Sequence, residues 1–138
     1  MRKIFFSRAM DGLEYDDIAT LSRKVREAVE AEGMKIANPF KGTRESFSAY
    51  ENRDYKDVVE RDIRELKTAN VFLCDMTIRN RNYIGTLCEM MYAYYLKIPV
   101  VIYTGDTGYE NRYWIRYHAK HICTSLEEAI ESIRNSSW

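Results

Sequence analysis

The chain of 138 residues is long enough to bury the core of one compact domain without disulfides or a structural metal. Hydrophobic residues make up 46% of it and charged residues 30%, and its 21 basic side chains balance 21 acidic ones. This composition excludes a disordered chain and a protein that binds nucleic-acid polymers through a general positive charge. Partners must therefore be recognised at a local site.

The three cysteines, Cys74, Cys88 and Cys123, are odd in number and far apart. This usage predicts reduced thiols in apolar surroundings rather than a disulfide framework. No apolar run reaches the roughly 18 residues of a membrane span, and the chain enters a strand pattern at Lys3 without a signal peptide. We expect a single domain over residues 1–138, located in the cytoplasm and without a membrane partner.

Strands and helices alternate along the first half of the chain. Lys3 to Phe6 predicts a buried strand, and apolar residues at helical spacing predict a helix from Ile18 to Glu32 that ends at Gly33. Met34 to Ala37 predicts a second strand. The polar segment from Pro39 to Asn52 predicts a loop.

The alternation continues through the second half. The expected elements are a helix from about Asp54 to Ala69, a strand from Val71 to Asp75, a helix from Thr86 to Leu96, strands at Pro99 to Tyr103 and His121 to Cys123, and a helix from Leu126 with a Ser125 to Glu128 capping box. This order predicts an α/β fold with a single doubly wound, mostly parallel five-stranded sheet of the flavodoxin-like or Rossmann-like kind. Ligands bind beyond the carboxyl ends of such strands, so we expect a site in the loops after Phe6, Asp75 and Tyr103.

Asp62 is predicted to place a carboxylate on the apolar face of its helix. That face consists of residues at helical spacing with Asp62, namely Val59, Ile63 and Leu66. Its neighbour Arg61 is expected to pair with Glu65 one turn on, which leaves Asp62 without a local partner. A buried carboxylate without a partner is either an internal hydrogen-bond anchor or part of a site, and the pattern leaves both open.

Glu89 lies in the run Gly85-Thr-Leu-Cys-Glu89, at the entry of a predicted helix. Glycine permits close approach of a ligand, and the first amide groups of the helix favour an ionised carboxylate, as a nucleophile requires. The alternative is structural, because Thr86 and Glu89 also have the T-x-x-E spacing of a capping box. The position at the carboxyl edge of the sheet, with Asp62 on a neighbouring helix, favours a site.

Three runs of the chain carry a family resemblance: Ala69-Asn-Val-Phe-Leu-Cys-Asp75, Gly85-Thr-Leu-Cys-Glu-Met-Met-Tyr-Ala93 and Lys97-Ile-Pro-Val-Val101. Their order and spacing resemble those of the nucleoside 2-deoxyribosyltransferases and their relatives, the 2'-deoxynucleoside 5'-phosphate N-hydrolases. The similarity covers roughly Lys3 to Tyr103. Its most specific part is the Gly-Thr-x-x-Glu-Met-x-Tyr-Ala block.

The resemblance implies that Glu89 attacks the anomeric carbon of a 2'-deoxynucleoside or its 5'-monophosphate, while Asp62 positions the sugar and assists proton transfer. It implies a covalent glycosyl-enzyme that is released by a second base in a transferase or by water in a hydrolase, without a cofactor. It also implies a homodimer or larger assembly. The expected substrate-binding residues are Phe5, Ser7, Arg8, Gly12, Asp75, Asn82, Tyr83, Gly85 and Thr86.

Some residues depart from the family pattern. Phe5 stands where relatives often have a tyrosine that touches the nucleophile, and Ser7-Arg-Ala-Met-Asp-Gly12 replaces a glycine-rich turn. Arg8 either holds a 5'-phosphate or base carbonyl or forms a surface salt bridge. Tyr83 stands where transferases have a base-reading aspartate, and Asn82 beside it is a candidate to replace that function.

Aromatic residues predict contacts with other molecules. The segment 109–117, rich in tyrosine and arginine, either stacks a base or forms a subunit contact, and the run Met90 to Leu96 is apolar nearly all round, as in an oligomer interface. His118 and His121 lack acidic or cysteine neighbours at ligand spacing, so we expect surface or packing roles and no metal.

Two other classes of function remain open. A nucleotide-binding sensor module would keep the pocket without turnover, and Phe5 with the altered first turn favours it. A scaffold for protein contacts would have no cavity beside Glu89 and would use Asp62 as a core anchor.

Overall fold

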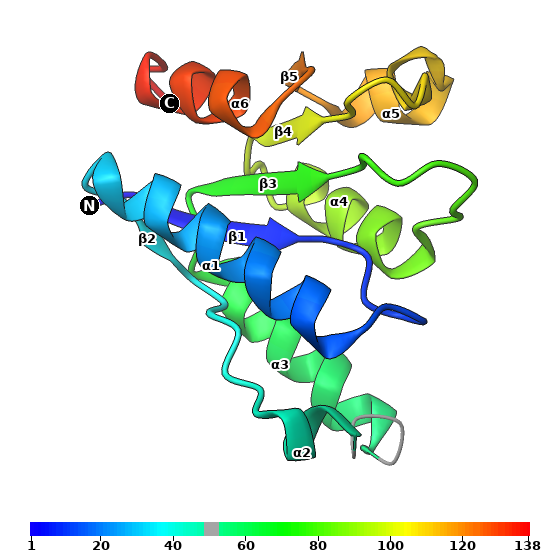
Figure 1. Cartoon of the computed structure of the whole chain (residues 1–138). Coiled ribbons are helices and arrows are strands. Elements are labelled where there is room, and N and C mark those ends of the chain that lie inside the picture. The colour runs from blue at the N-terminus through cyan, green and yellow to red at the C-terminus, as the bar shows by residue number, and fades with distance from the viewer. Residues whose placement is uncertain (49–52) are drawn as a thin grey trace.

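The computed structural model describes residues 1–48 and 53–138 of the chain. Its centre is one sheet of five parallel strands in the order β2-β1-β3-β4-β5, shown in Figure 1. The strands are β1 (Lys3–Ser7), β2 (Lys35–Ile36), β3 (Val71–Asp75), β4 (Val100–Tyr103) and β5 (His121–Cys123). The predicted α/β sheet with flavodoxin-like order is confirmed, and every pair in it is parallel.

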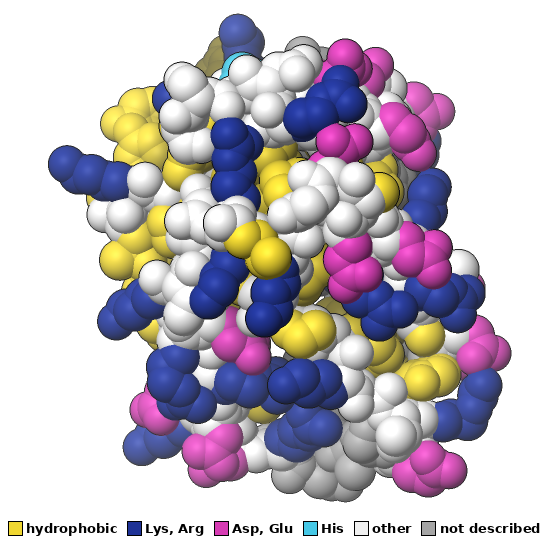
Figure 2. Space-filling view, turned by 90° about the vertical axis from the view of Figure 1, so that its left-hand side faces the viewer, with side chains coloured by type: hydrophobic (Ala, Val, Ile, Leu, Met, Phe, Trp, Pro, Cys, Tyr) yellow, Lys and Arg dark blue, Asp and Glu magenta, His cyan; other side chains and the backbone are white. Residues whose placement is uncertain are grey.

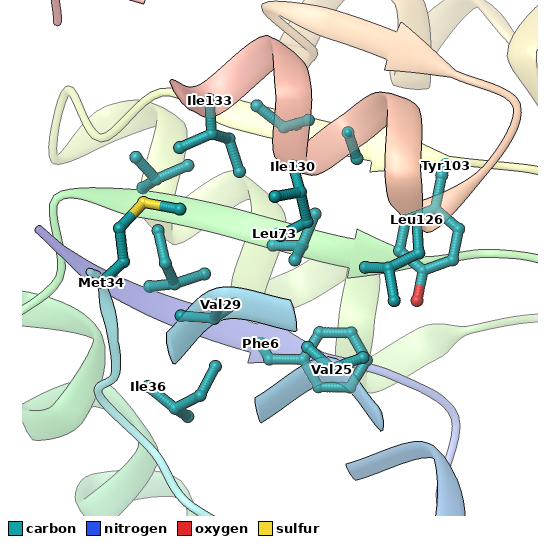
Figure 3. Close-up of a cluster of buried hydrophobic side chains, with 14 residues drawn as sticks. Phe6, Val25, Val29, Met34, Ile36, Leu73, Tyr103, Leu126, Ile130 and Ile133 are labelled. Carbon is teal, nitrogen blue, oxygen red and sulfur yellow. The ribbon is translucent and has the colours of Figure 1, made fainter. Parts of the chain in front are cut away.

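Helices cover both faces of the sheet. They are α1 (Tyr15–Ala31) and α6 (Leu126–Arg134) on one face, and α3 (Tyr55–Lys67), α4 (Ile84–Tyr95) and α5 (Tyr113–His118) on the other. Successive residues of a strand point to opposite faces of the sheet, so two hydrophobic cores form. Phe6 lies in one core with Val25 and Ile130, whereas Phe5 lies in the other with Leu66 and Met90. Figure 3 shows side chains of α1 and α6 directed onto the sheet in the first of these cores.

Three short helices lie in segments for which no helix was predicted. The predicted loop from Pro39 contains α2 (Arg44–Ser48), and the tyrosine-rich segment contains the 3-10 turn η2 (Tyr109–Asn111) before α5. The last part of that predicted loop, 49–52, lies outside the described residues.

The predicted ends of elements shift by a few residues. Gly33 ends the turn after α1 with a φ of 73°, as expected of a residue that adopts the left-handed region without strain. β2 has only two residues, and α4 begins at Ile84 rather than Thr86. The Ser125 hydroxyl accepts from the Glu128 amide at 3.2 Å, as in the predicted capping box. The Glu128 carboxylate, however, accepts from the Thr124 amide, one residue before the amide of Ser125 that a capping box uses.

All three cysteines are free, as predicted. Cys74 is buried, but Cys88 is exposed on α4, so the expectation of apolar surroundings is wrong for that residue. Within the described ranges, no helix has the length and apolar character that crossing a membrane requires. Figure 2 faces the end of the molecule where the strands begin and shows basic and acidic side chains interspersed, in keeping with the balanced charge.

Candidate active site

A cleft of about 1010 Å³ opens at the carboxyl ends of β1 and β3. Its walls are formed by the end of β1 and the loop after it, the loop after β2, helix α3, the loop before α4, and α4 itself. The loops after Phe6 and Asp75 therefore contribute to a cleft, as the topology predicts. The loop after Tyr103 supplies none of the described wall residues, contrary to expectation.

Glu89 is the largely buried carboxylate of this cleft. The Ser7 hydroxyl donates to Glu89 Oε1 at 2.7 Å, and Ser7 Oγ lies 3.1 Å from Thr86 Oγ1. Burial raises the pKa of Glu89 to about 7, the negative charge of Asp62 adds to this, and the hydrogen bond from Ser7 opposes it. Helix amide groups were expected to favour the ionised form of Glu89, but burial raises its pKa, and Glu89 lies beyond the first turn, where those groups act.

The first turn of α4 explains how Glu89 reaches the cleft. Tyr83 precedes the helix in a left-handed conformation with a φ of 54°, and its hydroxyl accepts from the Ile78 amide at 2.9 Å. The helix consequently starts two residues before Thr86, whose side chain is buried against Ser7. The capping box of Thr86 and Glu89 is wrong, since Glu89 lies in the second helical turn.

Asp62 lines the same cleft from α3. It is half-buried, and Arg61 Nη2 lies 3.5 Å from Asp62 Oδ1, so the prediction that it lacks a local partner is wrong. The apolar face is also narrower than predicted, because Val59 is 52% exposed. Burial raises the pKa of Asp62, and the Arg61 charge opposes that rise.

Asn38 fixes the end of β1 and so positions Ser7. Its side-chain oxygen accepts from the Phe6 amide at 2.8 Å and its amide group donates to the Phe6 carbonyl at 2.8 Å. The side chain thus continues the pairing that β2, with only two residues, does not provide. Sequence reasoning missed Asn38, although its place at the carboxyl end of a predicted strand could have identified it.

Arg8 lines the cleft at the start of the loop after β1. Its Nε donates to the Ala9 carbonyl at 3.1 Å and its Nη1 to the Ile18 carbonyl at 2.9 Å. Among the described residues it forms no salt bridge, so the surface ion-pair interpretation is not met. The guanidinium is oriented by backbone carbonyls and keeps its positive charge available to a ligand.

The structure brings most of the predicted site residues together. Besides Glu89 and Asp62, the cleft is lined by the predicted residues Ser7, Arg8, Asn82, Tyr83, Gly85 and Thr86. The other three lie away from its wall: Phe5, Gly12 and Asp75.

Phe5 and Asp75 belong to the scaffold beneath the cleft. Phe5 is 1% exposed and its ring stacks on Phe72 with centroids 5.9 Å apart. Asp75 accepts from the Thr77 amide at 2.9 Å, the Thr77 hydroxyl at 2.7 Å and the Tyr103 hydroxyl at 2.8 Å. These bonds hold the strand end, and Gly12 serves the turn before α1 with a φ of 76°.

Two side chains at the cleft were not among the predicted site residues. The Arg81 guanidinium donates to the Asp11 carbonyl and so links the loop before α4 to the loop after β1. Tyr92 lines the cleft from α4 and is 51% exposed. Arg81 was hidden because long-range contacts between loops leave no periodicity, whereas Tyr92 stands in the Gly-Thr-x-x-Glu-Met-x-Tyr-Ala block, which could have identified it.

The two histidines have packing roles, as expected. His118 is buried, its Nδ1 lies 2.6 Å from the Trp114 carbonyl, and its ring packs against Tyr94 and Tyr117. His121 stacks on Trp138.

The fold and the cleft define an α/β protein with a flavodoxin-like sheet and a carboxylate pair at its carboxyl edge. The family model described as nucleoside 2-deoxyribosyltransferase matches residues 12–127. The chain belongs to this family, and the resemblance read from its motifs is confirmed. Among curated proteins, none matches the sequence.

Solved structures share the fold across nearly the whole chain. A 2-deoxyribosyltransferase from Leishmania mexicana superposes with a TM-score of 0.73 at 13% identity and covers 100% of both chains. A 2-deoxyribosyltransferase from Bacillus psychrosaccharolyticus gives 0.66 at 16% identity, covering 99% of this chain and 93% of that one. A CMP N-glycosidase from Clostridium botulinum gives 0.63 at 14% identity, covering 96% and 97%.

Proposed function

We propose that the protein cleaves the N-glycosidic bond of 2'-deoxynucleosides or their 5'-monophosphates, with Glu89 as nucleophile. The observation that carries this proposal is the placement of Glu89 and Asp62 in one cleft, with Ser7 donating to the Glu89 carboxylate. Membership of the nucleoside 2-deoxyribosyltransferase family supports it. A cleft of about 1010 Å³ beside Glu89 also disfavours a scaffold without a ligand.

In the first step, a Glu89 oxygen forms a bond to the anomeric carbon while the bond from that carbon to the base nitrogen breaks. The electron pair of the broken bond leaves with the base, which takes up a proton. Positive charge develops on the sugar in the transition state, and nearby carboxylate charge stabilises it. In the second step, the nitrogen of another base or the oxygen of water displaces Glu89.

The pKa of Glu89 suits its proposed role as the nucleophile. A pKa of about 7 leaves a substantial fraction of Glu89 ionised at neutral pH, ready to attack. Burial also raises the pKa of Asp62, the Arg61 charge opposes that rise, and Asp62 is the candidate that relays a proton to the departing base. Ser7 keeps the Glu89 carboxylate in one orientation.

The polar side chains around the carboxylates are candidates for holding the substrate. Arg8 would bind an anionic or carbonyl group, while Asn82 and Tyr83 would contact the base. Gly85 lets the backbone approach the sugar closely. The transferases among the similar structures support transfer to a second base, and the N-glycosidase, which is named for a nucleotide, supports hydrolysis.

The test is to incubate the protein with each 2'-deoxynucleoside plus a different free base, and separately with each 2'-deoxynucleoside 5'-monophosphate. Chromatography then measures new nucleosides or released base. Glu89→Gln should lower the rate about a thousandfold or more, as loss of a covalent nucleophile does. The matched control is Glu60→Gln on the exposed side of α3, which should retain the rate. A reaction unaffected by Glu89→Gln, or none with any substrate, contradicts the proposal.

The second candidate is a nucleotide-binding module without turnover. Phe5 favours it, because no hydroxyl from this position on β1 reaches the nucleophile and its ring is buried on Phe72. Saturable nucleotide binding without base release, equal in the wild type and Glu89→Gln, would support this function.

We also propose that the chain acts in the cytoplasm as a homodimer or larger oligomer. Helices α4 and α5 expose a group of aromatic side chains, namely Tyr92, Tyr95, Tyr113, Trp114 and Tyr117. Tyr92 also lines the cleft, so a second copy on this surface would lie beside the site. Light scattering of the eluting protein should give at least twice the 16.3 kDa chain mass, and Trp114→Ser with Tyr117→Ser should reduce it to one chain.

A further inference from the structure

A second, smaller pocket lies beside the cleft, between α1 and the loop that follows β2. It has a volume of about 150 Å³. The end of β1 forms its floor, and the loop after β2 forms one wall through Asn38 and Phe40. The opposite wall is a single face of α1, because Ser22 and Arg26 are four residues apart on that helix.

The wall of this pocket carries positive charge only. Three arginines, Arg8, Arg23 and Arg26, are among its lining residues, and no aspartate or glutamate is among those described. In the described ranges, neither Arg23 nor Arg26 forms a salt bridge, whereas Lys24 between them pairs with Glu127 of α6. Arg23 and Arg26 therefore have no carboxylate partner among the described residues, whereas the charge of Arg8 is partly balanced by Asp75 and Asp17.

Hydrogen-bond donors in the pocket are also unused. Arg8 donates from Nε and Nη1 to backbone carbonyls, so its Nη2 remains as a donor for a ligand. The Ser22 hydroxyl, which also lines the pocket, forms no hydrogen bond with the described residues. Arginine side chains and a hydroxyl around a small space offer the donors that the oxygens of a tetrahedral anion accept. The volume is several times the roughly 30 Å³ that one water takes in the liquid, so the space admits such a group.

We propose that this pocket binds a phosphate group through Arg23, Arg26 and Arg8. Arg8 lines both the pocket and the cleft, so the bound phosphate lies next to the substrate space. Two sources share this chemistry: a phosphate carried by a nucleotide in the cleft, and a separate phosphate ion. The first source rests on the proposed function, whereas phosphate binding itself does not.

The experiment titrates inorganic phosphate into the full chain by calorimetry, at constant ionic strength. Saturable binding is expected, and Arg23→Ala and Arg26→Ala should each weaken it about tenfold, as loss of a charge-assisted contact does. The matched control is Lys24→Ala, which removes the same charge from the same helix but faces α6. Arg23 and Arg26 are exposed, so their replacement leaves the core intact, and thermal unfolding verifies this.

Two outcomes overturn the proposal: phosphate that does not saturate, and binding that weakens equally in Lys24→Ala. A second titration, of a 2'-deoxynucleoside 5'-monophosphate and its unphosphorylated nucleoside, identifies the source. Displacement of phosphate by the nucleotide, with nucleotide binding alone weakened in the arginine variants, assigns the pocket to the substrate phosphate. Simultaneous binding of both assigns it to a separate ion. Phosphate binding without any base release would leave this inference standing while the proposed function fails.

Discussion

The Ser7 hydroxyl donates a hydrogen bond of 2.7 Å to Glu89 Oε1 and so joins the end of β1 to the second turn of α4. Two opposing effects meet at this carboxylate. Burial and the Asp62 charge disfavour its ionised form, whereas the Ser7 hydrogen bond favours it. The result is a pKa of about 7, which places the titration of Glu89 within the range where enzymes are assayed.

Ser7→Ala should raise the pKa of Glu89 further, because it removes the hydrogen bond that favours the ionised form. The ionised form is the one that attacks, so the acid limb of the plot of kcat/KM against pH should move to higher pH. Activity should fall most below neutral pH and recover partly at alkaline pH. A pH series of initial rates measures this.

Thr86→Val is the control for Ser7→Ala. It removes a hydroxyl that pairs with Ser7 but leaves the bond from Ser7 to Glu89 in place. Its acid limb should move less than that of Ser7→Ala. Equal curves for Ser7→Ala and the wild type would show that Glu89 does not set the acid limb.

Asp62→Asn should shift the acid limb in the opposite direction. The Asp62 charge raises the pKa of Glu89, so its removal lowers that pKa and extends the ionised form to lower pH. The maximal rate should nevertheless fall about a hundredfold or more, because the proposed proton donor is lost. Arg61→Gln is the matched control, since it breaks the contact with Asp62 but keeps the carboxylate. A full rate in Asp62→Asn would exclude Asp62 as proton donor.

Glu89→Gln should stabilise the folded protein at pH 8 but not at pH 4. Burial raises the pKa of Glu89 from 4.5 to about 7. As pH rises between these values, the unfolded chain has already lost the proton that the folded chain still holds, so the free energy of unfolding falls. One pH unit of pKa difference corresponds to about 1.36 kcal/mol. Allowing for solvent at the open cleft, the gain at pH 8 should be about 2 kcal/mol.

Urea unfolding of the wild type and the variant at both pH values measures this gain. Glu60→Gln changes the same charge on the exposed surface of α3 and should alter stability by less than about 0.5 kcal/mol at either pH. A Glu89→Gln variant that is no more stable at pH 8 would show that the buried carboxylate imposes no cost.

Most of the fold could be predicted from the sequence because its signals are local. The unbroken apolar run 71–74 indicated a strand covered on both faces, and Gly33 marked a helix end. The strand β2 and the helix α2 were harder, because two paired residues or five helical ones carry no measurable periodicity. The structure of these two elements depends on contacts with other parts of the fold rather than on a local pattern.

The site was predictable only in part, for a different reason. Glu89 and Asp62 could be found because each lies at a recognisable place on a helix. Ser7 was expected to bind substrate, but its hydrogen bond to Glu89 could not be predicted, because the two residues are 82 positions apart and no pattern within one element links them. The burial that raises the pKa of Glu89 could not be predicted for the same reason, since it depends on the tertiary structure.

Tyr83→Phe should destabilise the loop between β3 and α4. The Tyr83 hydroxyl accepts from the Ile78 amide at 2.9 Å, and the ring packs edge-on against Tyr109. Phenylalanine keeps the ring but leaves that amide without its acceptor, which should cost about 1 to 3 kcal/mol. Tyr113→Phe is the matched control, because its side chain is 85% exposed and should change stability by less than about 0.5 kcal/mol. Hydrogen exchange at Ile78 should accelerate in Tyr83→Phe alone, and unchanged exchange would show that the hydroxyl does not anchor the loop from which α4 presents Glu89.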